Sequence, residues 1–149
     1  MRVVIQRVKQ ASCKVLIDGE YHLVSTIGHG LMLLVGFTHS DNEEVVKKMA
    51  KKIIDLRIFS DEAGKMNLDI KQVNGSILSI SQFTLYGDTR KGNRPSFVES
   101  MKHDEANKLY EFFNQTLTNY GIITKPGAFG EDMLLEPHCD GPVTIEMEY

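Results

Sequence analysis

The sequence lacks the features that would place it in a membrane, secreted or disulfide-rich class. It contains two cysteines, no tryptophan and four prolines in 149 residues. Two cysteines without a CxxC pair form no disulfide framework, which favours free thiols in a reducing compartment. The longest apolar run, residues 31–35, is far too short to span a bilayer, and no signal-peptide pattern precedes it. We therefore expect a cytoplasmic protein that does not enter a membrane.

An excess of positive charge is also missing. The formal net charge is −3, whereas phosphate neutralisation makes most non-specific nucleic-acid binders basic. Any contact with nucleic acid should therefore be local and depend on shape.

Familiar catalytic and metal-binding patterns are absent as well. There is no nucleophile elbow, HExxH, P-loop or dinucleotide fingerprint, and the five histidines lack metal-ligand spacing. We predict no metal and no cofactor. His138-Cys139-Asp140 could suggest a nucleophile beside a base, but adjacent residues on a strand face opposite ways. We therefore interpret Cys139 as a bystander.

Short strand-like segments and turn signals occur along much of the chain. Asp18-Gly19 and Asn74-Gly75 each predict a hairpin, because these pairs tolerate positive φ. The apolar run from Leu31 to Phe37 is typical of a strand buried on both faces. Further strands are expected at residues 3–8, 12–17, 21–27, 56–59, 76–84, 133–136 and 143–148.

Two segments have helical periodicity. Asp41 or Asn42 can cap a helix that begins near Glu43, and its lysines are interpreted as a solvated face. Asp104 opens a second helix, which ends before Gly121; its expected buried face is Leu109, Phe112, Phe113 and Leu117. The sequence predicts a single α+β domain over residues 1–149, with largely antiparallel strands in a barrel-like or two-sheet arrangement and two principal helices.

Two short segments carry the candidate chemistry. Ser81-Gln82-Phe83-Thr84-Leu85 lies at the expected end of a strand, where sites are often built. Asp140-Gly141-Pro142-Val143-Thr144 lies between the last two expected strands. Each segment taken alone is also compatible with an ordinary strand end or turn.

Together these two segments resemble the signature motifs of the D-aminoacyl-tRNA deacylase family of bacteria and eukaryotes. The resemblance extends over essentially the whole chain, with further matching segments at residues 6–8, 30–36, 57–59, 65–67, 91–95 and 127–130. One departure is Cys139, which stands where the family's second motif usually begins with Asn.

The resemblance implies a homodimeric hydrolase that releases D-amino acids, and also glycine, from tRNA and rejects L-aminoacyl-tRNA. The Gly141-Pro142 bond would be cis and enter the other subunit's site, where two carbonyl groups hold the substrate's α-amino group. Arg7 would brace this loop. Ser81 and Gln82 would fix their own loop and contact the terminal adenosine.

The resemblance also assigns the reaction little side-chain chemistry. Backbone N–H groups near Phe83 and Thr84 would polarise the ester carbonyl, with assistance from the 2′-hydroxyl of the terminal adenosine. Thr84 itself could be a nucleophile, but no histidine or lysine lies near it in the sequence.

A basic cluster follows the first motif. Arg90, Lys91 and Arg94 could meet acceptor-stem phosphates or belong to a solvated loop. Two other functions stay open on the residues alone. One is a related editing enzyme for an achiral or small L-amino acid, and the other is a dimeric RNA-binding module without activity.

Overall fold

A computed structural model describes residues 1–149. One six-stranded sheet forms its centre, in the order β2 (Glu20–Ile27), β1 (Arg2–Ile17), β3 (Gly30–Gly36), β6 (Ser76–Ser81) and β7 (Ile123–Pro126), with β8 (Met133–Glu148) also paired to β1. A small hairpin of β4 (Phe59–Ser60) and β5 (Met66–Leu68) stands apart. The predicted α+β class with two helices is confirmed.

The sheet is curled because β1 is long and serves two parts of it. Its first half pairs with β3, its second half pairs with β2, and β8 runs antiparallel along both. Ser25 Oγ on β2 donates a 2.6 Å hydrogen bond to the Pro126 carbonyl on β7, which links the two ends of the strand order. The result is a nearly closed, barrel-like arrangement.

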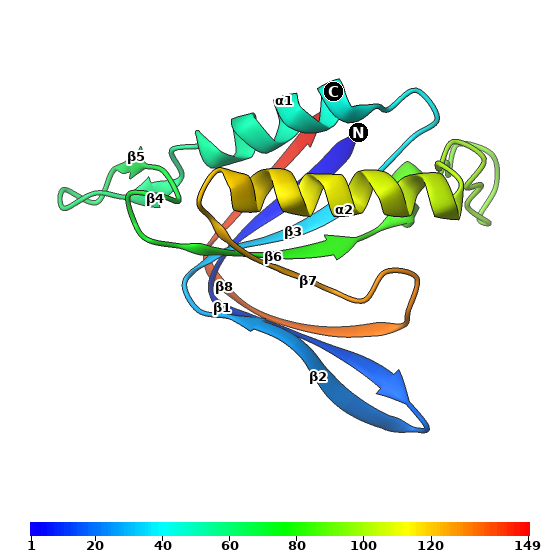
Figure 1. Ribbon diagram of the computed structural model, residues 1–149, viewed down its shortest axis with the longest axis horizontal. Coiled ribbons are helices and arrows are strands. Elements are labelled where there is room, and N and C mark those ends of the chain that lie inside the picture. Colours follow the sequence, from blue (N-terminus) through cyan, green and yellow to red (C-terminus); the bar gives the residue numbers. More distant parts are fainter.

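Two helices cover one face of this sheet (Figure 1). They are α1 (Glu43–Ile54) and α2 (His103–Asn119). Of the two capping residues that the sequence allowed, Asn42 caps α1 by accepting hydrogen bonds from the N–H groups of Glu44 and Val45. Gly121 follows α2 with φ +88°, the conformation expected just after a helix end.

The core has two parts that lie on opposite sides of the sheet. The larger cluster lies between the helices and the sheet, and the smaller one lies inside the curl. On β3, Leu31 and Leu33 face the larger cluster and Met32 faces the smaller. The prediction of a strand buried on both faces is therefore confirmed.

The expected hairpin at Asn74-Gly75 is wrong. Asn74 does adopt a positive φ of 51°, but residues 70–74 form a turn rather than a strand. The following strand, β6, pairs in parallel with β3 and β7. The dipeptide specifies local backbone geometry, but it does not select the strand that pairs next.

Several expected boundaries also differ. The segments 3–8 and 12–17 form one strand, as do 133–136 and 143–148, because β1 and β8 pair on both sides of an irregular stretch near Arg7. Conversely, β6 ends at Ser81, and Phe83–Tyr86 forms a short 3-10 helix, η1. Residues 83 and 84 therefore lie on η1 rather than on a strand. On α2, Leu109 and Phe112 are only partly buried, whereas Tyr110 is buried.

No helix in the structure is both long and apolar enough to cross a membrane.

Candidate active site

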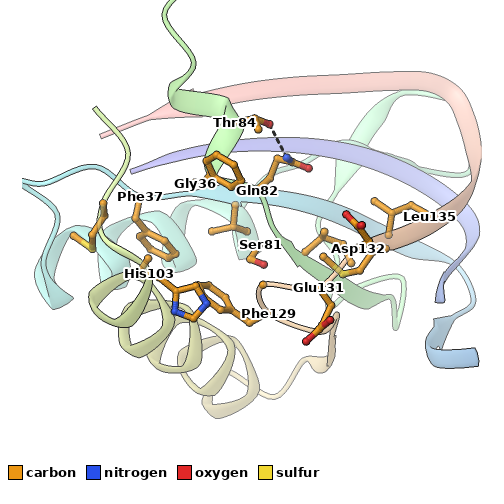
Figure 2. A pocket seen from close by; sticks show the side chains of 17 residues that line it. Gly36, Phe37, Ser81, Gln82, Thr84, His103, Phe129, Glu131, Asp132 and Leu135 are labelled. Atoms are coloured by element: carbon orange, nitrogen blue, oxygen red, sulfur yellow. Dashed lines mark hydrogen bonds between the residues drawn. The ribbon is translucent and has the colours of Figure 1, made fainter. Parts of the chain in front are cut away.

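A cavity of about 630 Å³ lies where β3 and β6 end beside the start of α2. Ser81, Gln82, Phe83 and Thr84 line it together with residues of the segment before β8. Figure 2 shows Ser81 and Gln82 on one side and Phe129 and His103 on another. The first motif therefore forms part of a real concave site.

Hydrogen bonds fix the backbone of this motif. Gln82 N–H donates to the Val35 carbonyl at 2.7 Å, which extends the β3–β6 pairing by one residue. Ser100 Oγ donates to the Phe83 carbonyl at 3.0 Å, and the Phe83 ring packs edge-on against Phe97. The turn from β6 into η1 is thus held from both sides, whereas the Phe83 side chain stays largely exposed.

Thr84 has an amide, not a base, as its side-chain partner. Gln82 Nε2 donates to Thr84 Oγ1 at 2.6 Å, as drawn in Figure 2. The titratable side chains that line the cavity are His103, Glu131 and Asp132. His103 lies across the cavity from Thr84 in Figure 2. The structure therefore supplies no activating base at the threonine hydroxyl.

The second motif forms a bulge in β8. Cys139 is opposite Val8 and Thr144 is opposite Gln6, so residues 140–143 of β8 lie opposite Arg7 alone. The Gly141–Pro142 peptide bond is cis, and Gly141 has φ +115°, which a side chain would rarely adopt. Gly141 and Pro142 are both exposed. The bulge therefore presents this dipeptide at the surface.

Arg7 holds the base of this bulge. Its Nε lies 3.1 Å from the Asp140 carboxylate and 3.3 Å from the Asp140 carbonyl oxygen. A second guanidinium nitrogen donates to the Ile58 carbonyl at 2.6 Å. Because Arg7 is buried, its charge and hydrogen bonds are satisfied mainly by these partners.

The two motifs lie at opposite ends of β3. Val35 on β3 pairs with Ser81 and with Val3, whereas Leu31 pairs with Arg7. Four residues of strand, about 13 Å, separate these levels. Gly141 and Pro142 also do not line the cavity. A single chain therefore does not bring the two motifs to one site.

The basic loop beside the cavity is ordered by main-chain pairing. Asp88 and Ser96 exchange two backbone hydrogen bonds that close the loop. The Arg90 guanidinium donates two hydrogen bonds to the Asp88 carboxylate, at 2.9 and 2.8 Å. This hydrogen bonding lowers the pKa of Asp88 to about 2. Lys91 and Arg94 are exposed and form no ion pair. Arg90 is thus the least available of the three predicted phosphate contacts.

Sequence reasoning missed part of the cavity wall. His103, Glu131 and Asp132 had no local pattern that marked them. Phe129 lies in a segment that carried the family resemblance, 127–130, so a signal for it was present. Cys139 is an exposed free thiol.

Comparison with known proteins agrees with the motifs. The model of the D-Tyr-tRNA(Tyr) deacylase family matches residues 4–148. The chain belongs to this family. It is 53% identical to the D-aminoacyl-tRNA deacylase of Staphylococcus carnosus over 99% of this chain and 95% of that protein, and 54% identical to that of a Geobacillus species with the same coverage.

Solved structures have the same fold. A protein described as c-Myc DNA Unwinding Element Binding Protein superposes with a TM-score of 0.91 and 38% identity, over 100% of this chain and 99% of that one. A probable eukaryotic D-amino acid tRNA deacylase gives a TM-score of 0.83 at 18% identity, over 98% and 97% of the two chains. The second similarity concerns the fold alone.

Proposed function

We propose that the protein hydrolyses the ester bond of D-aminoacyl-tRNA and spares L-aminoacyl-tRNA, as a chiral proofreading enzyme of the cytoplasm. Family membership and the two matching segments, residues 81–85 and 140–144, support this activity. Glycyl-tRNA is a further substrate in this proposal, because glycine has no side chain for a chiral pocket to reject.

We infer that the working unit is a homodimer. The observation that carries this inference is the separation of the two motifs at opposite ends of β3. A substrate that touches both the cavity and Gly141–Pro142 must then lie between two copies of the chain. The exposed dipeptide of one subunit would close the cavity of its partner.

Selection of the D form follows because the site holds two substituents of the substrate's α-carbon, the ammonium group and the ester. The carbonyl oxygens of Gly141 and Pro142 accept hydrogen bonds from the α-ammonium group, while the cavity holds the ester and the terminal adenosine. One further direction at the α-carbon then leads to solvent and accepts a D side chain. An L side chain would meet the protein, so steric exclusion rejects it.

The proposed chemistry is water attack on a positioned ester. N–H groups at Phe83 and Thr84 polarise the carbonyl, Ser81 and Gln82 hold the adenosine, and its 2′-hydroxyl assists. The bond between the carbonyl carbon and the ribose oxygen breaks, and this oxygen leaves with a proton. Positioning alone can supply roughly 7–11 kcal/mol, so a nucleophilic side chain is not required.

Contacts to the RNA backbone are assigned to the basic loop. In this proposal Lys91 and Arg94, which are exposed and form no ion pair, contact acceptor-stem phosphates, whereas Arg90 must first leave Asp88. Because the protein is negatively charged overall, this local contact orients the acceptor end rather than driving general RNA binding.

Single-turnover hydrolysis of D-Tyr-tRNA, L-Tyr-tRNA and Gly-tRNA tests the activity. We expect rapid release of D-Tyr and glycine and no enzyme-dependent release of L-Tyr. Equal rates for D- and L-Tyr would refute the proposal. Tight binding of all three without turnover would instead indicate an RNA-binding module, and preference for a small L-amino acid would indicate a different editing enzyme.

A further inference from the structure

A buried tyrosine lies behind the cavity wall without lining the cavity. Tyr110 of α2 is 3% exposed, and its hydroxyl donates a 2.6 Å hydrogen bond to the main-chain carbonyl of Ser79 on β6. Burial raises the pKa of Tyr110, so the hydroxyl stays protonated and remains a donor. Ser79 precedes Ser81 by two residues on the same strand, so this bond reaches the strand that ends in the first motif.

The same carbonyl oxygen also fixes the segment 127–130, which contributes Phe129 and Gly130 to the cavity wall. The Gly127 N–H donates to Ser79 O at 2.8 Å. Gly127 is tightly packed, because a Cβ there would lie 2.8 Å from Ile80 Cδ1 and from Met133 Sδ. The segment 127–130 therefore packs closely against β6. The Ser79 carbonyl, which accepts hydrogen bonds from both Tyr110 and Gly127, holds the two together.

The tyrosine ring supports the aromatic residue of that segment. Phe129 lines the cavity, and its ring centroid lies 5.5 Å from that of Tyr110 and 5.0 Å from that of His103. Both partners come from α2. Tyr110 thus links α2 to two other elements. Its hydroxyl bonds to β6, and its ring packs against Phe129 of the segment 127–130.

We propose that Tyr110 is a positioning residue that holds Phe129 against the first motif and thereby sets the affinity of the cavity for the terminal nucleoside of the substrate. This inference rests on the proposed deacylase function. It acts through Phe129 and the 127–130 backbone, since Tyr110 itself does not line the cavity.

The test compares Tyr110→Phe with a matched variant of the same helix. Tyr110→Phe removes the hydroxyl and keeps the ring. Thr116→Val also removes one hydroxyl, whose hydrogen bond to the Phe112 carbonyl at 2.7 Å is within α2 and outside the cavity. Both variants lose one side-chain to main-chain bond, and only the first loses a link to the cavity wall.

We expect Tyr110→Phe to raise KM for D-Tyr-tRNA about fivefold at unchanged kcat, the effect of one lost hydrogen bond on binding. Hydrogen exchange of the Gly127 amide should become faster. Thr116→Val should leave KM, kcat and Gly127 exchange unchanged, even if it unfolds at lower urea. Unchanged KM and exchange in Tyr110→Phe would overturn the proposal.

A second variant keeps the proposal testable if Tyr110→Phe does not fold. Phe129→Leu keeps the Tyr110 hydrogen bond and removes the aromatic wall, and we expect the same selective rise in KM. Normal KM in Phe129→Leu would refute the assigned role. If the wild type fails to hydrolyse D-Tyr-tRNA, the deacylase proposal fails, whereas the Gly127 exchange comparison still decides whether Tyr110 fixes this segment.

Discussion

Thr84 is the only residue of the first motif that we considered as a nucleophile. Its hydroxyl accepts a hydrogen bond from the side-chain amide of Gln82. We expect Thr84→Val, which keeps the shape, to retain kcat/KM for D-Tyr-tRNA within about tenfold of wild type, the effect of a lost hydrogen bond. Thr84→Ser serves as the control that keeps the hydroxyl. A loss beyond a hundredfold in Thr84→Val alone, or an aminoacyl ester on Thr84 detected by mass spectrometry, would assign it a covalent role.

Cys139 is a position at which the chain departs from the family motif that it resembles. The family's usual Asn could bond to nearby backbone, whereas a thiol is a weak donor and acceptor. The bulge obtains its support from Arg7 instead. Because Cys139 is exposed, Cys139→Ala should change the free energy of unfolding by less than about 0.5 kcal/mol and leave turnover unchanged.

The thiol would be implicated by a different result. A hundredfold slower turnover of Cys139→Ala on D-Tyr-tRNA, about 2.7 kcal/mol in the barrier, with unchanged urea unfolding would show that sulfur takes part in the reaction. The same loss together with weakened folding would instead show that the bulge depends on this side chain.

At the scale of elements, the β8 bulge is held to β1 mainly by Arg7. Arg7→Met leaves Asp140 and the Ile58 carbonyl without their donor, so we expect a loss of about 2 kcal/mol in the free energy of unfolding, measured by urea denaturation. Arg7→Lys should lose less, because it keeps the charge but lacks the guanidinium fork.

A second ion pair between the same strands provides the control. Lys14 and Glu136 also join β1 to β8, at 2.6 Å, but both side chains are considerably more exposed. Lys14→Met should therefore change stability by less than about 1 kcal/mol and leave hydrolysis unaffected. Equal effects of Lys14→Met and Arg7→Met would contradict a specific role for Arg7.

The two turn signals show how much of the fold the local sequence can predict. Asp18-Gly19 and Asn74-Gly75 carry the same turn signal, and Asp18 and Asn74 both adopt positive φ. Only the first pair joins two antiparallel partners. Which strands pair depends on long-range packing, such as the insertion of β6 between β3 and β7. The local signal therefore predicted the turns correctly but the topology only in part.

Burial on α2 shows a similar limit. Periodicity predicted Leu109 and Phe112 as core residues because they are apolar, yet they are only partly buried. Tyr110 is buried instead, because its hydroxyl finds the Ser79 carbonyl. The sequence of a helix does not show which polar partner another element will supply. The hydrogen bond from Tyr110 behind the cavity wall could therefore not be predicted.

At the scale of the whole molecule, the two motifs could be identified from the sequence, but their separation could not. It results from the order of β8, β1, β3 and β6 in the sheet. The cavity lies at the Gly36 end of β3 and the exposed Gly141–Pro142 dipeptide lies towards the Gly30 end. A substrate that contacts both motifs, as proposed, needs two copies of the chain, so under this proposal the dimer is a requirement for catalysis rather than for folding alone.

Mixing two inactive variants tests this requirement. Gly141→Ala places a Cβ 3.2 Å from the Arg7 guanidinium at a φ of +115° and should disable the dipeptide. Ser81→Leu should fill the cavity of its own chain. Neither variant alone should hydrolyse D-Tyr-tRNA, whereas each mixed dimer would combine the intact cavity of one chain with the intact dipeptide of the other. Half of randomly reassorted dimers are mixed and each has one intact site of two, so the mixture should recover about a quarter of wild-type activity. Refolding the two variants together from urea permits the exchange, and refolding each alone is the control. If the motifs acted within one chain, every chain would carry one defect, and no mixture would regain activity.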